Sequence, residues 1–415
     1  MVKNFLNILI FLILLSTTTL SNDITVDPDG EIRTLTEAIR IADNGDRIIV
    51  QPGHYREGKI IVDRSVEIVG IDYPEFDGEN KYEVIRIKAD SVTIRGLKIT
   101  NVGVSYIDDR AGIRVEKSHH CTIEDNIFEN TFFGIYLSQS SNCRVEGNEL
   151  YAYGTREANT GNGIHLWYSR DITIENNIVT GHRDGIYLEF VRNTYIQKNL
   201  GENNLRYGLH FMFSDSCYYH ENTFRRNGAG VAVMYTRHVV MTDNTFEYNW
   251  GTAAYGLLLK DISRSRIENN IFYKNTVGIF SEGSNWIDIS ENDFIENGWA
   301  VRIWSSSYDN TFTQNNFINN TFDVATNSKR NFNEFVQNYW SNYDGYDLAG
   351  DGYGDVPYRP VRLFSYITEK HPPAMILLHS FFINVLDFAE RIVPTITPET
   401  LVDEQPVMRR IRWRE

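Results

Sequence analysis

The sequence predicts an all-β fold, a right-handed parallel β-helix whose coils are about 22 residues long. Three observations predict it: a recurring glycine, an asparagine fourteen residues after each of these glycines, and apolar residues that alternate with period two. A fixed period of this size is the signature of a solenoid, in which neighbouring coils bury each other's apolar faces. The glycines are Gly112, Gly134, Gly163, Gly185, Gly208, Gly230, Gly256 and Gly278, and the asparagines are Asn126, Asn148, Asn177, Asn199, Asn222, Asn244, Asn270 and Asn292.

Each coil is expected to contain three short strands. Residues one and three positions after the glycine, such as Ile113 and Val115, are apolar, and so are those eleven and sixteen positions after it, such as Ile123 and Phe128. Because parallel strands lie about 4.8 Å apart, the equivalent asparagines should form a hydrogen-bonded ladder along the stack. The crossover rule for parallel strands gives the solenoid its right hand.

The chain is expected to divide into five segments. It begins with a basic residue, an apolar run too short to cross a bilayer and several small residues, which predict a cleavable signal peptide and an exported protein. A short helical pattern at 35–42 should cap the open N-terminal end of the solenoid. The segments are a signal peptide (1–21), an N-terminal cap and entry strand (22–58), the parallel β-helix (59–340), a capping loop rich in Asp, Gly and aromatic residues (341–373) and a C-terminal helical docking segment (374–415).

Composition excludes several classes of protein. The formal net charge is −15, whereas a nucleic-acid-binding protein needs a basic surface. No later run reaches the roughly 20 apolar residues of a transmembrane helix. Three cysteines are too few for a disulfide framework, and an odd number leaves at least one thiol unpaired. Cys121 and Cys143 lie on adjacent coils, so they either form a disulfide bridge or fill the core as free thiols, and we favour the second alternative. Cys217 is too many coils away to join them.

The strand alternation places a candidate metal site on the outer face. Met212 and Met234 occupy the same position on successive coils, with His210 two residues before Met212 and His165 two coils away. Thioether and imidazole donors favour Cu(I) over harder metals, and sulfurs on adjacent strands are spaced to share one ion. The alternatives are that the methionines pack under the enlarged loops or a protein partner, and that His165 is a surface histidine beside Trp167.

A calcium site in the capping loop is not favoured. Asp347, Asp351 and Asp355 recur every fourth residue in this loop, but the EF-hand spacing and its terminal glutamate are lacking. We therefore expect a turn-rich loop.

The last segment changes character and becomes strongly apolar after Pro372-Pro373. Such a helix must bury its apolar face against another body. Docking to a membrane-embedded partner and packing against the end of the solenoid both remain open. The candidate partner-binding residues are Ile376, Leu377, Phe381, Phe382, Val385 and Phe388.

Several longer stretches carry a resemblance to a known family. The chain resembles the NosD family, periplasmic maturation factors for nitrous oxide reductase. The stretches that carry it include Tyr207-Gly-Leu-His-Phe-Met-Phe-Ser, Asn227-Gly-Ala-Gly-Val-Ala-Val-Met-Tyr, Asn297-Gly-Trp-Ala-Val-Arg, Gly350-Asp-Gly-Tyr-Gly-Asp-Val-Pro-Tyr-Arg-Pro-Val and Thr397-Pro-Glu-Thr-Leu-Val.

The resemblance implies a periplasmic adaptor and not an enzyme. Proteins of this family act with an ABC transporter, made of a permease and an ATPase that hydrolyses ATP, take copper from a membrane-anchored chaperone lipoprotein and help to load nitrous oxide reductase. The C-terminal helix would then lie on the permease, which would make the protein peripheral to the membrane. Of the metal-capable residues, His210, Met212 and Met234 fall in family motifs.

The alternative function is a secreted polysaccharide lyase or epimerase on the same fold. Such an enzyme needs converging carboxylates together with an arginine or lysine base. Glu157, Arg156 and His182-Arg183-Asp184 are the candidates, but the sequence shows no tight acidic cluster on one strand face.

Overall fold

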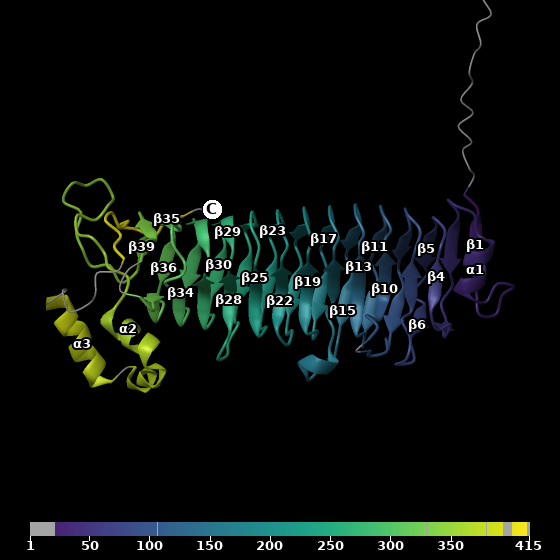
Figure 1. The fold of residues 1–415 in the computed structure, drawn as a ribbon, viewed down its shortest axis with the longest axis horizontal. Helices are drawn as coiled ribbons and strands as arrows, with labels where there is room; N and C mark the ends of the chain where they lie inside the picture. Colours follow the sequence, from purple (N-terminus) through teal and green to yellow (C-terminus); the bar gives the residue numbers. More distant parts are fainter. Residues whose placement is uncertain (1–20, 106, 329–330, 379, 393–400, 413–415) are drawn as a thin grey trace, which may run out of the picture.

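The computed structural model describes residues 21–412 except 106, 329–330, 379 and 393–400. The expected signal peptide therefore lies almost entirely outside the described residues. The described chain forms a rod-shaped parallel β-solenoid of about 14 turns, with α1 at one end and α2 and α3 at the other (Figure 1). The predicted all-β parallel β-helix is confirmed.

Three parallel sheets of 14, 13 and 12 strands run the length of the rod, and each coil in the middle of the rod contributes one strand to each sheet. Sheet A contains β1 (Asp23–Val26), β2 (Arg47–Val50), β5 (Glu67–Gly70), β8 (Thr93–Arg95), β11 (Thr122–Glu124), β14 (Arg144–Glu146), β17 (Thr173–Glu175), β20 (Tyr195–Gln197), β23 (Tyr218–His220), β26 (Val240–Thr242), β29 (Ser263–Glu268), β32 (Asn285–Ser290), β35 (Thr311–Thr313) and β38 (Glu334–Val336). Sheet B contains β3 (His54–Tyr55), β6 (Glu75–Asp77), β9 (Lys98–Thr100), β12 (Ile127–Glu129), β15 (Glu149–Tyr151), β18 (Ile178–Thr180), β21 (Leu200–Glu202), β24 (Thr223–Arg225), β27 (Thr245–Glu247), β30 (Ile271–Tyr273), β33 (Asp293–Ile295), β36 (Asn316–Ile318) and β39 (Tyr339–Trp340). Sheet C contains β4 (Ile60–Val62), β7 (Ile85–Ile87), β10 (Ala111–Glu116), β13 (Phe133–Ser138), β16 (Ile164–Trp167), β19 (Asp184–Glu189), β22 (Tyr207–Met212), β25 (Ala229–Met234), β28 (Tyr255–Lys260), β31 (Val277–Glu282), β34 (Trp299–Ile303) and β37 (Phe322–Thr326).

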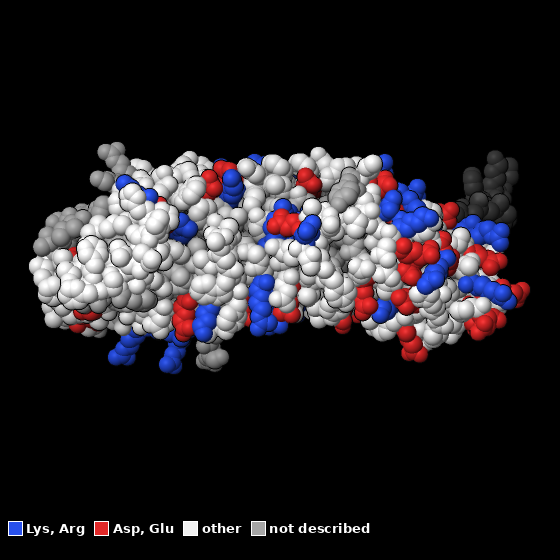
Figure 2. All heavy atoms as spheres, turned by 90° about the horizontal axis from the view of Figure 1, so that it is seen from below, with Lys and Arg blue, Asp and Glu red and all other residues white. Residues whose placement is uncertain are grey.

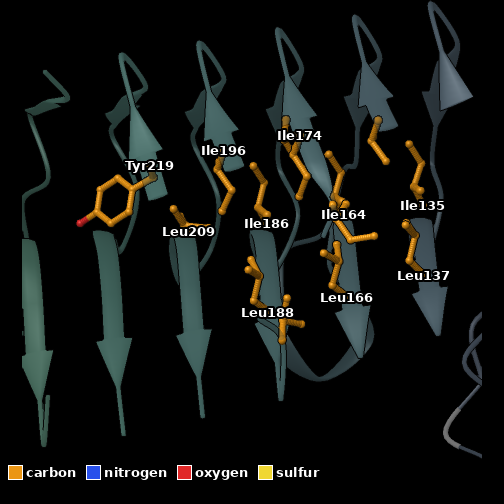
Figure 3. Close-up of a cluster of buried hydrophobic side chains, with 14 of the residues drawn as sticks. Ile135, Leu137, Ile164, Leu166, Ile174, Ile186, Leu188, Ile196, Leu209 and Tyr219 are labelled. Carbon is orange, nitrogen blue, oxygen red and sulfur yellow. The ribbon is translucent and has the colours of Figure 1, made fainter. Parts of the chain in front are cut away.

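The interior is a continuous apolar core, in which the inward residues of successive coils stack (Figure 3). Phe246, Phe272 and Phe294 stack with ring centroids 4.7 and 4.8 Å apart. The recurring glycine is required by a close approach between coils: a Cβ at Gly208 would lie 2.7 Å from the carbonyl oxygen of Gly230. All three cysteines are buried free thiols, as the core-filling alternative predicts.

The predicted asparagine ladder is present and buried. Asn199 shows the pattern: its backbone and side-chain N–H groups donate to Asn222 Oδ1 at 2.9 and 3.0 Å, and its side chain also donates to the carbonyl oxygen of Ile174. The ladder runs to Asn338, whose backbone and side-chain N–H groups donate to the buried carboxylate of Asp403. Each buried turn of the chain thus satisfies its backbone groups through its neighbour.

The N-terminal end is capped as predicted. Helix α1 (Leu35–Ile41) begins after Thr34, whose side chain accepts a hydrogen bond from Glu37 N at 3.2 Å. Its buried residues Leu35, Ala38 and Ile39 join the apolar core and cover the open end of the first coils.

The C-terminal end is more elaborate than the sequence predicted. Helix α2 (Leu363–Lys370), the 3-10 helix η2 (Pro372–Leu377) and helix α3 (Phe381–Ile392) lie beside the last coils. Residues 401–411 are not helical, so the prediction of a helical segment up to 415 is wrong for this stretch. They return along the solenoid, where Asp403 bridges to Phe335, Val407 bridges to Tyr339 and Arg410 pairs with Asp293 at 2.9 Å.

The aspartates of the capping loop bind backbone amides of their own loop. Asp347 accepts hydrogen bonds from the N–H groups of Gly350 and Gly352 at 2.6 and 2.9 Å, and these bonds hold the pKa of this carboxyl below its usual range. The loop is therefore the turn-rich cap that the sequence favours.

Candidate metal-binding face on sheet C

Two rows of side chains point outward from sheet C along the middle of the solenoid. The first row lies two residues after each coil glycine and contains Tyr136, His165, Tyr187, His210 and Ala232. The second row lies two residues further on and contains Trp167, Glu189, Met212, Met234 and Lys260.

Met212 and Met234 are direct register partners on β22 and β25. Both side chains are half-buried on the outside of the barrel, as the alternation predicts. Strands in a sheet are about 4.8 Å apart, and a metal–sulfur bond is about 2.3 Å long. Two thioethers at this spacing can therefore contact one soft metal ion from opposite sides.

His210 points outward from β22 but is only 4% exposed. Its Nδ1 lies 3.4 Å from Asp184 Oδ2, and Asp184 is itself held by Arg206, whose Nε donates to Oδ1 at 2.8 Å. Burial opposes ionisation of Asp184, but the hydrogen bonds from Arg206 and His210 hold its pKa at about 2. Among the described residues, nothing pairs with His210 Nε2.

His165 is in a different electrostatic setting. Its Nδ1 lies 3.2 Å from Asn162 Nδ2, while Asn162 Oδ1 accepts a hydrogen bond from Arg183 at 3.2 Å. Because an arginine only donates, the amide oxygen must face Arg183 and the amide N–H must face His165. Burial, together with the charge of Arg183, lowers the pKa of His165 to about 3. The neutral ring therefore accepts at Nδ1 and carries its proton on Nε2.

The prediction that the first outer row faces solvent is wrong for both histidines. His165 is 8% exposed because the rings of Phe133, Tyr136 and Tyr187 pack around it at centroid distances of 4.6 to 5.2 Å. The alternative of a surface histidine beside Trp167 is also wrong. Outward-facing aromatic side chains cover each other, so an outward register does not guarantee solvent contact.

Sequence reasoning did not place Arg206 in this site, and it named Asp184 only as a candidate residue of a polysaccharide lyase or epimerase. Asp184 lies one residue before a coil glycine, in a row that holds Ala111, Phe133, Tyr207 and Ala229 on other coils and one neutral polar residue, Asn162. A carboxylate in a mostly apolar row was the available signal, because buried carboxylates need a partner.

A second ladder of buried side chains runs from His182 through Asn204 and Asn227 to Asn249, and His182 is its one histidine in this stretch. The backbone N–H of His182 donates to Asn204 Oδ1 at 3.1 Å, and the His182 ring is fully buried. Burial lowers the pKa of His182 to about 4, below the 6.5 of an exposed imidazole. The unfolded chain therefore takes up a proton as the pH falls below 6.5, whereas the folded protein does not until about pH 4. Stability is lost across this window.

Replacement of His182 by asparagine should remove part of this acid sensitivity. Between pH 7 and pH 5, the variant should lose about 2 kcal/mol less unfolding free energy than the parent, since each pKa unit corresponds to about 1.4 kcal/mol. Urea unfolding at the two pH values measures the difference. The exposed His238→Asn serves as the control, and equal pH dependence in all three proteins would contradict the assignment.

The C-terminal helices leave an apolar face uncovered. Ile383 is buried with Phe322 and Phe364, so one face of α3 packs against the end of the solenoid. The opposite face is exposed, with Phe381 at 82% and Phe388 at 65%. Figure 2 shows few charged side chains over this end of the molecule. Of the candidate partner-binding residues, all are exposed: Ile376, Leu377, Phe381, Phe382, Val385 and Phe388.

Among the described residues, no helix is both long enough and apolar enough to cross a membrane. Within the same residues, histidine, cysteine and carboxylate side chains form no group of three that could hold a metal ion.

The chain matches known proteins over most of its length. A family model described as "Periplasmic copper-binding protein (NosD)" matches residues 151–345, and a right-handed β-helix model matches residues 38–161 and 83–188. A "Probable ABC transporter binding protein NosD" of Pseudomonas aeruginosa is 28% identical over 89% of both chains. One of the same name from Stutzerimonas stutzeri is 26% identical over 88% of both chains. The chain is therefore similar to NosD proteins over most of its length.

Solved structures share the fold of this protein at low identity. The catalytic unit of a GH87 α-1,3-glucanase from Streptomyces thermodiastaticus has a TM-score of 0.62 and 13% identity, covering 79% of this chain and 70% of the glucanase. A family 28 exopolygalacturonase from Yersinia enterocolitica has a TM-score of 0.51 and 12% identity, covering 79% of both chains. Likeness at this identity supports the β-helix and says nothing of a shared activity.

Proposed function

We propose that this protein binds Cu(I) as cargo and passes it on during assembly of the copper sites of nitrous oxide reductase. It acts in the periplasm as an adaptor and not as an enzyme, with an ABC transporter whose ATPase subunit hydrolyses ATP. The family description as a periplasmic copper-binding protein and the names of the two relatives support this role. A membrane-anchored copper chaperone is the proposed donor and nitrous oxide reductase the proposed acceptor.

The observation that carries the proposal is the in-register pair of methionines on the outer face of sheet C. Met212 and Met234 offer two thioethers at the spacing of one soft ion, and His210 follows the same face, two residues and about 7 Å along the strand from Met212. Sulfur and imidazole donors favour Cu(I). Half-burial of the pair keeps the cargo close to the surface, where it can be exchanged with a partner.

His165 is a weaker candidate than the other three residues. It lies two strands from His210, and Tyr187 stands between the two rings at 4.8 Å from each. The tautomer set by Asn162 places a proton on His165 Nε2, where a metal would need a lone pair. We therefore assign the proposed cargo site to Met212, Met234 and His210.

Replacement of both Met212 and Met234 by leucine should weaken Cu(I) binding at least tenfold, because it removes both sulfurs while preserving volume and apolarity. Competition against a chromophoric Cu(I) chelator measures the affinity. The control is Met408→Leu, which removes a half-buried sulfur at the C-terminal end of the rod. Equal affinity in the double variant and the parent would contradict the site.

The exposed face of η2 and α3 is the proposed contact with the permease. Its aromatic and aliphatic side chains are the kind that are buried at protein interfaces. In this arrangement, the rod stands on the membrane partner through its C-terminal end, and the protein is peripheral to the membrane.

A further inference from the structure

Asp184 is a carboxylate that is buried on the outer face of the barrel, and neither the solenoid repeat nor the thioether pair accounts for it. Asp184 is fully buried at the start of β19, where the next coil has Tyr207, the previous coil has the neutral Asn162, and Ala111 and Ala229 occupy this position further along the rod. Burying a charge is costly unless the charge is paired and hydrogen-bonded. Arg206 provides the pair through one edge of its guanidinium, with Nε donating to Oδ1 at 2.8 Å and a terminal nitrogen donating to Oδ2 at 2.5 Å.

The Oδ2 atom of Asp184 also contacts the ring of His210, which lies at a row position where the next two coils have apolar residues. His210 Nδ1 lies 3.4 Å from Asp184 Oδ2, whereas Ala232 and Leu258 hold the same row on the next two coils. The rings of Tyr187 and Tyr207 pack against His210, each with its centroid 4.8 Å away. The ring is therefore fixed in one orientation by packing and by the carboxylate.

We propose that Asp184, held by Arg206, is a positioning residue that keeps the proton of His210 on Nδ1 and leaves a lone pair on Nε2 for the copper cargo. An ionised carboxylate only accepts hydrogen bonds, so the ring nitrogen beside it must carry the proton. A histidine that binds a metal commonly donates its other N–H to a carboxylate, which fixes its tautomer and orientation. The inference rests on the proposed function, because it concerns the same site.

His165 provides an internal comparison for the tautomer of His210. His165 is equally buried in the same outer row, but its Nδ1 faces the amide N–H of Asn162 and the proton must be on Nε2. Two histidines in similar aromatic surroundings therefore differ in tautomer because one faces a carboxylate and the other an amide. The tautomer of His210 thus follows from its partner and not from burial.

The tautomers of His210 and His165 can be measured by NMR in the metal-free protein. In protein labelled with ¹⁵N-histidine, long-range ¹H–¹⁵N correlation at neutral pH should show a protonated Nδ1 for His210 and a protonated Nε2 for His165. Signals are assigned by their loss in His210→Gln and His165→Gln. A neutral His210 with its proton on Nε2 would overturn the inference, and this measurement uses the wild-type chain.

The effect on the cargo is tested with Asp184→Asn. The amide can donate to Nδ1 and move the His210 proton to Nε2, so Cu(I) affinity should fall about 10- to 100-fold, the range seen when an outer partner of a metal ligand is removed. The control is Asn162→Leu, which removes the partner of His165 and should leave the Cu(I) affinity within about twofold. Circular dichroism establishes that both variants are folded.

The outcomes separate the inference from the proposed function. A folded Asp184→Asn variant that binds Cu(I) as tightly as the parent overturns the inference, even if the methionine double variant has lost binding. A parent protein that binds no Cu(I) overturns both. An affinity restored by Asp184→Glu together with a His210 proton on Nδ1 supports the inference, because a merely structural carboxylate would not link the two measurements.

Discussion

Replacement of Asn222 by alanine should destabilise the solenoid by about 3–5 kcal/mol. The side chain of Asn222 donates to the carbonyl oxygens of Ile196 and His220 at 2.9 and 3.0 Å, and its Oδ1 accepts two N–H groups of Asn199. All of these contacts lie at or near the buried interior, where each unsatisfied polar group costs about 1–3 kcal/mol. Several such groups lose their partner at once, and a cavity is added.

Equilibrium urea unfolding followed by circular dichroism measures this loss, with hydrogen exchange to locate it. Because coils contact only their neighbours, the exchange rates should rise most in the coils next to Asn222. The control is Asn203→Gly, which removes an exposed asparagine at a turn where φ is 53° and glycine is unstrained. A loss below about 1 kcal/mol for Asn222→Ala would show that the ladder is not a main source of stability.

Replacement of two exposed phenylalanines of α3 by glutamate should strongly weaken docking to the membrane partner. Phe381 and Phe388 are 82% and 65% exposed, and burying each phenylalanine in an interface contributes about 1.5–3 kcal/mol. Phe381→Glu combined with Phe388→Glu should therefore weaken co-purification with the transporter from detergent-solubilised membranes by 30-fold or more. The fold should be unaffected, since the packed face of the helix is the one that carries Ile383.

The matched control for this docking experiment is Trp250→Glu, a 57% exposed aromatic on a loop between β27 and β28. It also replaces an exposed aromatic residue by glutamate, but far along the rod from α3 (Figure 1). Equal recovery of the transporter with the double variant and with the parent would show that this face is not the contact. Loss of recovery with Trp250→Glu would place the contact on the wall of the solenoid.

The repeating part of the fold could be predicted because each coil carries its own signals. The glycine, the asparagine and the alternating apolar residues act through contacts to the next coil, so their spacing reports directly on the stack. The same alternation correctly placed Met212 and Met234 outside the barrel and side by side. Cys121, Cys143 and Cys217 were assigned to the interior by the same register.

The parts that could not be predicted depend on contacts that are not periodic. Asp403 closes the asparagine ladder from 65 residues further along the chain, and no local pattern reveals such a return. The burial of His165 and His210 arises from rings on neighbouring coils that cover the outer face. The partnership of Asp184 with Arg206 joins two coils through side chains that belong to no repeat.

X-ray absorption at the copper edge of the Cu(I)-loaded protein tests the central claim most directly. The account predicts two sulfur ligands at about 2.3 Å and one nitrogen ligand, with the sulfur signal lost in the Met212→Leu/Met234→Leu variant. A first shell of nitrogen and oxygen alone, or a sulfur signal that persists in that variant, would contradict the assignment of the thioether pair.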